Sequence, residues 1–135
     1  NTTRRQRQMC IRDRFYAYFL LGLVLNWVFT PIIAAADFGF VFNELTSDAQ
    51  NALLRDFTSF FVATFLFSIF GVITLNPVWF FSAGLIYIGA GVFNLIAIYA
   101  HGTGFNQIFV GEFILGSWPI ALGLVLYFKQ KKTLD

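Results

Sequence analysis

Apolar and polar positions alternate along this chain in long blocks, a pattern that predicts membrane-spanning helices. Residues 15–36, 57–75 and 78–100 contain no charged side chain, and residues 108–128 contain a single one, Glu112. A helix rising ~1.5 Å per residue needs about 20 apolar residues to cross a ~30 Å hydrocarbon core. We therefore predict an all-α, four-transmembrane-helix bundle with up-down-up-down order and spans over about 15–36, 53–75, 78–100 and 108–128.

The joints between these blocks carry turn and capping signals. Asn76-Pro77 predicts a tight turn between the second and third spans, and the polar residues 101–107 predict a short loop before the fourth. Residues 47–50 read Ser-Asp-Ala-Gln, a capping box that predicts a helix start near Asp48, continuous with the second span. Residues 15–132 are thus expected to form one membrane domain.

Composition strengthens the membrane interpretation. Hydrophobic residues make up 58% of the chain and charged residues 12%, whereas soluble domains carry about 25% charged residues. Phe, with 19 copies, far outnumbers Tyr and Trp, and Phe tolerates the full depth of a bilayer while Tyr and Trp favour its interfaces. A domain with a water-facing surface is therefore not expected.

Residues 1–14 differ from the rest of the chain. They hold five arginines and one aspartate, whereas the remainder has four basic and six acidic residues. The segment begins without Met, and residues 8–14 resemble a translated sequencing-adapter read-through, so we expect a non-native tail. A native basic cytoplasmic arm is the alternative. Cys10, the single cysteine, lies here, so no disulfide and no thiolate metal site is expected.

Charge near the last span predicts the orientation. Lys129, Lys131 and Lys132 directly follow it, and short flanks rich in Lys and Arg face the cytoplasm. An even number of spans places both termini on that side of a multi-pass protein. The segments 37–56 and 101–107 then face outward.

Small and polar residues recur at helical spacing in every span. They are Gly22, Asn26, Thr30 and Asp37 in the first, Thr64, Ser68 and Gly71 in the second, Gly84, Tyr87, Gly91, Asn94, Ile98 and His101 in the third, and Glu112, Gly116, Pro119 and Gly123 in the fourth. One interpretation is close packing between helices. The other is a polar-lined cleft that opens to the outer side, where the ionisable residues gather.

Glu112 is the leading candidate for a functional residue. It lies about one turn inside the fourth span, where a carboxylate must find a partner, a proton or water. Arg55 is the only Arg or Lys of the outer half and could form an ion pair with Glu112. Alternatively, Arg55 pairs locally with Asp56 or Asp48 while Glu112 lies at the interface.

Four further candidates lie on the polar faces, namely His101, Asn94, Asn26 and Tyr87. His101 could titrate near neutral pH or be a solvated loop residue. Asn94 could hydrogen-bond Asn26 across the bundle or contact a ligand, and Tyr87 lies on the same face. Pro119 is expected to free a backbone carbonyl one turn earlier. Motifs for nucleotide phosphates, zinc proteases and hydrolases are absent from the sequence, so no catalytic residue, metal or cofactor and no nucleic acid partner is expected.

The residues also resemble a family. Arg55-Asp56 at the start of the second span, a glycine-containing third span that ends at Gly102, and Glu112 in the fourth are similar to the bacterial membrane proteins of domain of unknown function 4345, which are loosely like DoxX-type proteins in size. The resemblance covers about residues 15–132 and implies a four-helix protein of the bacterial inner membrane. The family typically has an Arg near the position of Asn94, which this chain lacks.

These observations favour a non-enzymatic membrane protein that binds a hydrophobic small molecule or membrane lipid, or that serves a membrane complex or homo-oligomer. One alternative is an accessory subunit of a quinone-linked redox system, to which the DoxX-type likeness points. The other is a small proton-coupled transporter with Glu112 as its proton site.

Overall fold

The structure is a computed structural model that describes residues 2–104 and 107–134. Within this part of the chain all the regular secondary structure is helical, with no strand. The elements are α1 (Thr2–Phe29), α2 (Pro31–Asp37), the 3-10 helix η1 (Phe42–Glu44), α3 (Ser47–Thr74), α4 (Pro77–His101) and α5 (Gln107–Leu134). The prediction of an all-α protein is confirmed for these residues.

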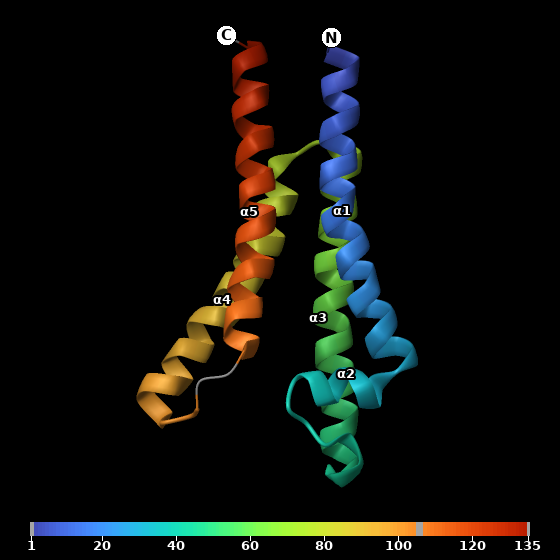
Figure 1. Cartoon of the computed structure of the whole chain (residues 1–135), viewed down its shortest axis with the longest axis vertical. Coiled ribbons are helices and arrows are strands. Elements are labelled where there is room, and N and C mark those ends of the chain that lie inside the picture. Colours follow the sequence, from blue (N-terminus) through green and yellow to red (C-terminus); the bar gives the residue numbers. More distant parts are fainter. Residues whose placement is uncertain (1, 105–106, 135) are drawn as a thin grey trace.

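Several helices are long and apolar enough to cross a membrane. In the described residues they are α3, α4 and the Val110–Leu134 part of α5, and a fourth span results if the bent pair Ile11–Phe29 and Pro31–Asp37 is counted as one. Successive long helices run in opposite directions, and both termini lie at the same end of the molecule (Figure 1). We call this the terminal end, and the opposite end, with α2 and the α4–α5 connection, the loop end.

The first apolar block is broken, which differs from a continuous span over 15–36. The helix ends at Phe29, and α2 departs from the axis of α1 by 119°. Pro31 supplies no N–H and disfavours helical backbone at Thr30, whose φ and ψ are −132° and 62°. The Thr30 hydroxyl donates to the backbone carbonyl of Asn26 at 2.9 Å, so a side chain completes the end of α1.

No break separates residues 2–14 from the first span. α1 extends from Thr2 to Phe29, and both α1 and α5 continue past the α3–α4 turn at the terminal end (Figure 1). Asp13 of α1 is only 3% exposed, and Lys129 of α5 is near enough to act on it electrostatically.

The start of α3 agrees with its capping signal to within about a residue. The N-cap is Thr46, whose hydroxyl accepts a hydrogen bond from the backbone N–H of Ala49 at 3.2 Å. The helix then continues to Thr74 without interruption, as predicted for the second span. Asn76 caps α4 in the same way, accepting from the N–H of Val78 at 3.1 Å, with Pro77 in the first turn.

Glycines bring α4 and α5 into close contact. A Cβ atom on Gly84 would lie 2.8 Å from the backbone oxygen of Gly116, and one on Gly116 would lie 2.7 Å from Cγ1 of Ile88. Because both helices have their smallest residue at the crossing, their backbones approach more closely than larger side chains would allow. For this pair, the small-residue face serves packing.

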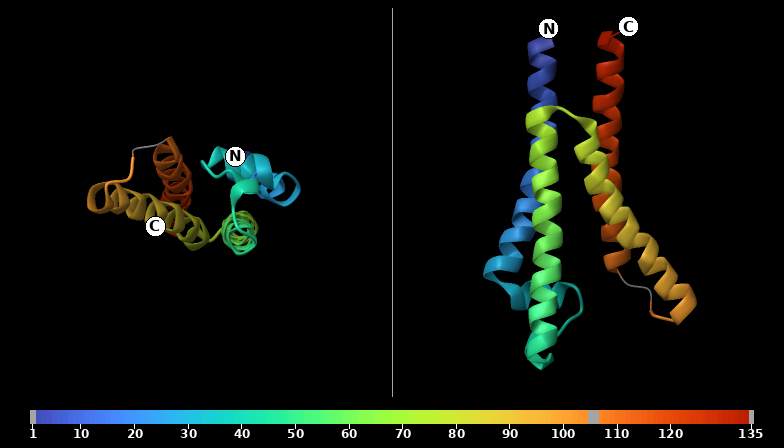
Figure 2. Two further views of the ribbon diagram at one scale, coloured as in Figure 1. Left: turned by 90° about the horizontal axis from the view of Figure 1, so that it is seen from below. Right: turned by 180° about the vertical axis from the view of Figure 1, so that it is seen from behind.

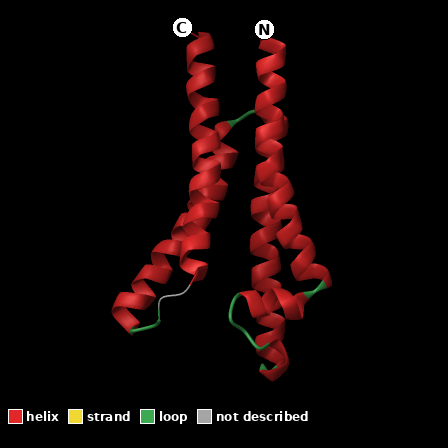
Figure 3. Ribbon diagram, in the orientation of Figure 1, coloured by secondary structure: helices red, strands yellow, loops and turns green. Residues whose placement is uncertain are grey.

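The molecule consists of two helix pairs that separate toward the loop end. α1 packs on α3, α4 packs on α5, and α3 joins the pairs by its contact with α4. The views in Figure 2 show the pairs diverging away from the α3–α4 turn, and Figure 3 shows that loops lie mainly at the wider end. The join is close near the turn, where the ring of Phe80 lies against Gly71.

Candidate functional site

A cavity of about 460 Å³ lies between the two helix pairs, toward the loop end, where Asp37 of α2 is among its lining residues. Its walls come from the α2–η1 segment, α3, α4 and α5. Five of the eleven lining residues are aromatic, namely Phe38, Phe57, Phe60, Phe61 and Tyr87. The remaining lining residues are the acidic Asp37, Asp56 and Glu112 and the apolar or small Ala90, Gly111 and Leu115.

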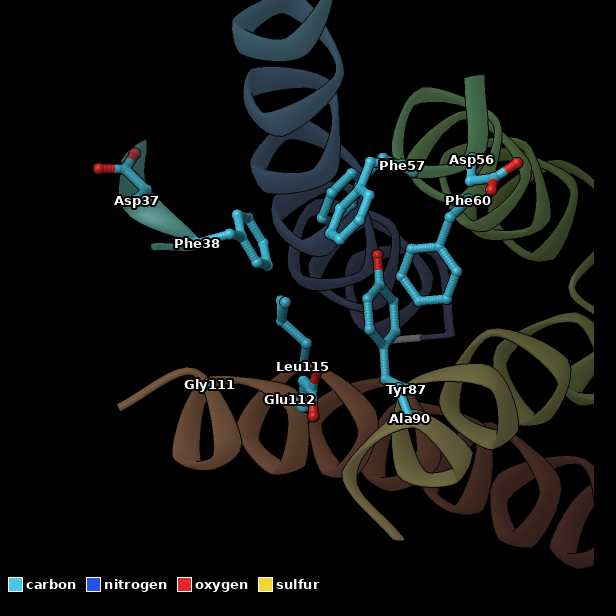
Figure 4. A pocket seen from close by; sticks show the side chains of 11 residues that line it. Asp37, Phe38, Asp56, Phe57, Phe60, Tyr87, Ala90, Gly111, Glu112 and Leu115 are labelled. Carbon is cyan, nitrogen blue, oxygen red and sulfur yellow. The ribbon is translucent and has the colours of Figure 1, made fainter. Parts of the chain in front are cut away.

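Three phenylalanines of α3 form one wall, because Phe57, Phe60 and Phe61 share a helix face at i, i+3 and i+4. The Phe38 ring, which follows α2, meets Phe57 edge-on with ring centroids 5.2 Å apart. Tyr87 of α4 meets Phe60 edge-on at 4.9 Å. Figure 4 shows the rings of Phe38, Phe57, Phe60 and Tyr87 around a shared space.

A hydrogen bond at the cavity wall joins α3 to α4. The hydroxyls of Tyr87 and Thr64 are 2.8 Å apart, and both residues are almost completely buried. Thr64 Oγ1 also lies 3.1 Å from the carbonyl oxygen of Phe60, which can only accept. The threonine proton therefore goes to the backbone and the Tyr87 hydroxyl donates to Thr64. The sequence placed Tyr87 and Thr64 on polar faces of separate spans, and the structure joins those faces.

A second tyrosine joins α1 to α5. The Tyr16 hydroxyl donates to the backbone oxygen of Leu115 at 3.0 Å. This carbonyl lies four residues before Pro119, whose missing N–H would have been its partner in α5. The carbonyl that Pro119 was expected to free is thus satisfied by another helix. Trp118 packs edge-on against Tyr16 at 5.1 Å, which reinforces the contact.

Glu112 lies on the α5 wall of the cavity and is partly buried. The side-chain amide of Asn94 in α4 donates to Glu112 Oε2 at 3.4 Å, a long hydrogen bond. The sequence predicted a role for both residues but offered Asn26 or a ligand as the partner of Asn94. The Asn26 side-chain oxygen instead accepts from the hydroxyl of Thr30, which directly follows α1, and Asn26 does not line the cavity.

Arg55 does not pair with Glu112 in this structure. Its Nε lies 3.0 Å from Asp56 Oδ1, and the two side chains are 72% and 66% exposed. This is the local pairing that was the alternative at the sequence level. Arg55 and Asp56 are neighbours at the loop end of α3, and their ion pair is exposed to solvent and does not involve α5. Such exposed pairs add little stability. Asp56 contributes to the cavity rim, whereas Arg55 does not line it.

His101 also lies apart from the cavity. It is the last residue of α4, is exposed, and precedes the left-handed Gly102, whose φ is 69°. Of the seven candidates from the sequence, Glu112, Asp56 and Tyr87 line the cavity, and Asn94 contacts it through Glu112. The aromatic residues of α3 were missed because phenylalanines in an apolar block resemble lipid-facing positions. Their i, i+3, i+4 spacing was the available signal.

The charged residues in the lining all have the same sign. Asp37, Asp56 and Glu112 line the cavity, and no Lys, Arg or His is among its lining residues in the described part of the chain. Three acidic groups suggest a cation. Nevertheless, no group of three or more His, Cys, Asp or Glu among the described residues is arranged to hold a metal ion.

Comparison with protein-family models, with curated proteins and with solved structures finds no match to this chain.

Proposed function

We propose that this protein is a four-span integral membrane protein that binds a small apolar or lipid-like molecule without catalysing a reaction. The observation that carries the proposal is the cavity of about 460 Å³ with aromatic walls between the two helix pairs. Its volume lies within the range of about 300–1,000 Å³ typical of small-molecule sites. Apolar walls with a few polar groups are the usual form of such a site.

The outer surface supports a lipid environment. Large apolar side chains point outward on α1, α3 and α4, including Phe29 (74% exposed), Ile73 (71%) and Phe93 (72%). Water-facing proteins rarely expose apolar surface on this scale. In hydrocarbon the same side chains carry no penalty, so we assign the bent pair α1–α2 and the helices α3, α4 and α5 to four spans.

We further propose that both termini are cytoplasmic and that the cavity opens on the outer side of the bacterial inner membrane. The support is the position of Lys131 and Lys132 in the last turn of α5, at the terminal end that also holds the N-terminus (Figure 1). The bacterial membrane follows from the resemblance to the family of domain of unknown function 4345, which also remains a proposal.

The binding proposal can be tested by what the protein retains. The full chain would be purified in a mild detergent or in native-lipid discs, and bound molecules would be extracted and identified by mass spectrometry. Ala90→Trp places a bulky ring in the cavity wall and should release most of the retained molecule. Ala100→Trp makes the same change at an exposed position of α4 and is the matched control.

Two outcomes of this experiment would change the proposal. Equal retention by the wild type, Ala90→Trp and Ala100→Trp would contradict binding in the cavity. Quinone as the retained molecule would instead support the quinone-linked redox alternative, since an aromatic wall also suits a flat ring.

Proton-coupled transport is a second candidate, favoured by the position of Glu112 on the cavity wall within α5. The wild type in liposomes loaded with a pH-sensitive dye should then pass protons down an imposed gradient, and Glu112→Gln should stop the flux. Equal flux from wild type, Glu112→Gln and protein-free liposomes would exclude this role.

A further inference from the structure

We propose that the cavity selects amphiphiles with a cationic head group, such as hydrophobic amines or quaternary ammonium compounds, with Glu112 as the counter-charge. The inference rests on the proposed binding function and specifies its ligand class. Three features support it, namely the sign of the lining charges, the rings that line the cavity, and the largely apolar surroundings of Glu112.

The negative charge of the lining disfavours anionic ligands. Asp56 is offset by Arg55 at 3.0 Å, which leaves Asp37 and Glu112 as the acidic groups of the lining without such an offset in the described residues. In Figure 4, Asp37 lies apart from the rings and Asp56 lies beside Phe60 on α3, whereas Glu112 lies beside Leu115 on α5. A fatty acid or another anionic amphiphile would meet like charge here, which disfavours binding.

The rings provide the second feature. Aromatic faces carry partial negative charge and attract ammonium groups within about 6 Å of the ring centre. Phe57, Phe60 and Tyr87 line the same cavity as Glu112, and Phe60 and Tyr87 already meet edge-on. Aromatic rings and a carboxylate that line one cavity can together stabilise a desolvated cation and its apolar substituents.

The surroundings of Glu112 provide the third feature. A carboxylate in a largely apolar wall loses hydration, and this loss is costly unless an opposite charge replaces the water. The contact from Asn94 is an uncharged amide at 3.4 Å, so it orients the carboxylate without cancelling its charge. A bound cation would supply the opposite charge, whereas a neutral quinone or an acyl chain would leave it unbalanced.

The test uses three probes of nearly equal shape and different charge. They are tetraphenylphosphonium (positive), tetraphenylmethane (neutral) and tetraphenylborate (negative), and their binding to the full chain in lipid nanodiscs is measured by equilibrium dialysis. Empty nanodiscs correct for partition into lipid. We expect saturable binding that is strongest for the phosphonium, at least about tenfold weaker for the neutral probe, and weakest for the borate.

Variants then assign the charge to one residue. Glu112→Gln should weaken phosphonium binding about tenfold or more and leave binding of the neutral probe unchanged, and Glu112→Asp should recover much of the preference. Glu44→Gln removes a negative charge from the exposed η1 segment at the same end of the molecule and is the matched control. Thermal unfolding of each variant shows whether it is folded. If Glu112→Gln does not fold, the order of binding of the three probes to the wild type alone tests the selection of cations.

The outcomes separate this inference from the proposed function. Equal saturable binding of the three probes, or preference for the borate, would overturn the selection of cations while keeping a binding cavity. An unchanged phosphonium preference in folded Glu112→Gln would overturn the role of that residue. Failure of all three probes to bind above empty nanodiscs would contradict the binding function itself.

Discussion

Two tyrosine hydroxyls account for the polar links between the helix pairs that the described residues show near the cavity. Tyr87 donates to Thr64 between α4 and α3, and Tyr16 donates to the Leu115 carbonyl between α1 and α5. In an apolar medium such bonds have no water to compete with them. Measured values inside membranes are nevertheless modest, at about 0.6–2 kcal/mol, because the unfolded state finds partners too.

Removing one of these hydroxyls should therefore have a small, specific effect. Tyr87→Phe keeps the ring against Phe60 but deletes the hydrogen bond to Thr64, and we expect a loss of about 1 kcal/mol in the free energy of unfolding. Denaturation in detergent measures it. Tyr99→Phe, at a residue that is 84% exposed on the same helix, should leave stability unchanged. An equal loss in both variants would contradict a role for the Tyr87–Thr64 bond.

The Leu115 carbonyl is available to Tyr16 because Pro119 has no N–H to bond to it within α5. Tyr16 and Pro119 should therefore be energetically coupled. Pro119→Ala restores an N–H that can bond to the Leu115 carbonyl within α5, which reduces what Tyr16 contributes. We expect Tyr16→Phe to cost about 1 kcal/mol in the wild type and clearly less in the Pro119→Ala background. A double-mutant cycle of unfolding free energies provides the measurement, and additive losses would contradict the link.

At the scale of elements, the α4–α5 pair is the closest approach in the molecule that glycine positions reveal. Gly84 and Gly116 meet backbone to backbone, whereas the Cβ of a residue at position 89, on the same helix, would contact nothing within 4 Å. Gly84 and Gly89 of α4 thus differ in the space available for a methyl group. This provides a matched pair for testing the packing.

Gly84→Ala and Gly89→Ala should change stability in opposite directions. The first pushes a Cβ to 2.8 Å from the Gly116 carbonyl oxygen and should cost about 1–3 kcal/mol through overpacking. The second replaces glycine by a better helix former in open space and should be neutral or stabilising by about 0.5–1 kcal/mol. Unfolding of both variants in the same detergent gives the comparison. A destabilised Gly89→Ala or an unaffected Gly84→Ala would mean that α4 and α5 pack differently.

For the whole molecule, the proposed orientation predicts which residues can be labelled from outside the cell. In a Cys10→Ser background, a cysteine at Thr103 in the α4–α5 connection should react with a membrane-impermeant maleimide on intact spheroplasts. A cysteine at Thr133, near the end of α5, should react only after the membrane is permeabilised. The reverse pattern would invert the orientation, and labelling of both sites on intact spheroplasts would contradict the four-span topology.

Much of the architecture follows from solvent preference along the chain. The long blocks without charge predicted helices of membrane type, and the described helices agree over α3, α4 and α5. Caps and turns followed from local chemistry, since Asn76-Pro77 opens α4 and the signal near Asp48 opens α3 to within about a residue. The break at Thr30 was missed because an uncharged block was treated as one span, although Pro31 carried the signal.

The sequence by itself determined that this protein is helical, where α3 and α4 begin and end, and which faces are small or polar, because these properties depend on neighbours within a few residues. Only the tertiary structure decided which faces meet. It paired Thr64 with Tyr87, gave the carbonyl freed by Pro119 to Tyr16, and assigned Asn94 rather than Arg55 to Glu112. The cavity, too, was decided only by the tertiary structure, because it depends on how far the two helix pairs diverge and not on any one segment.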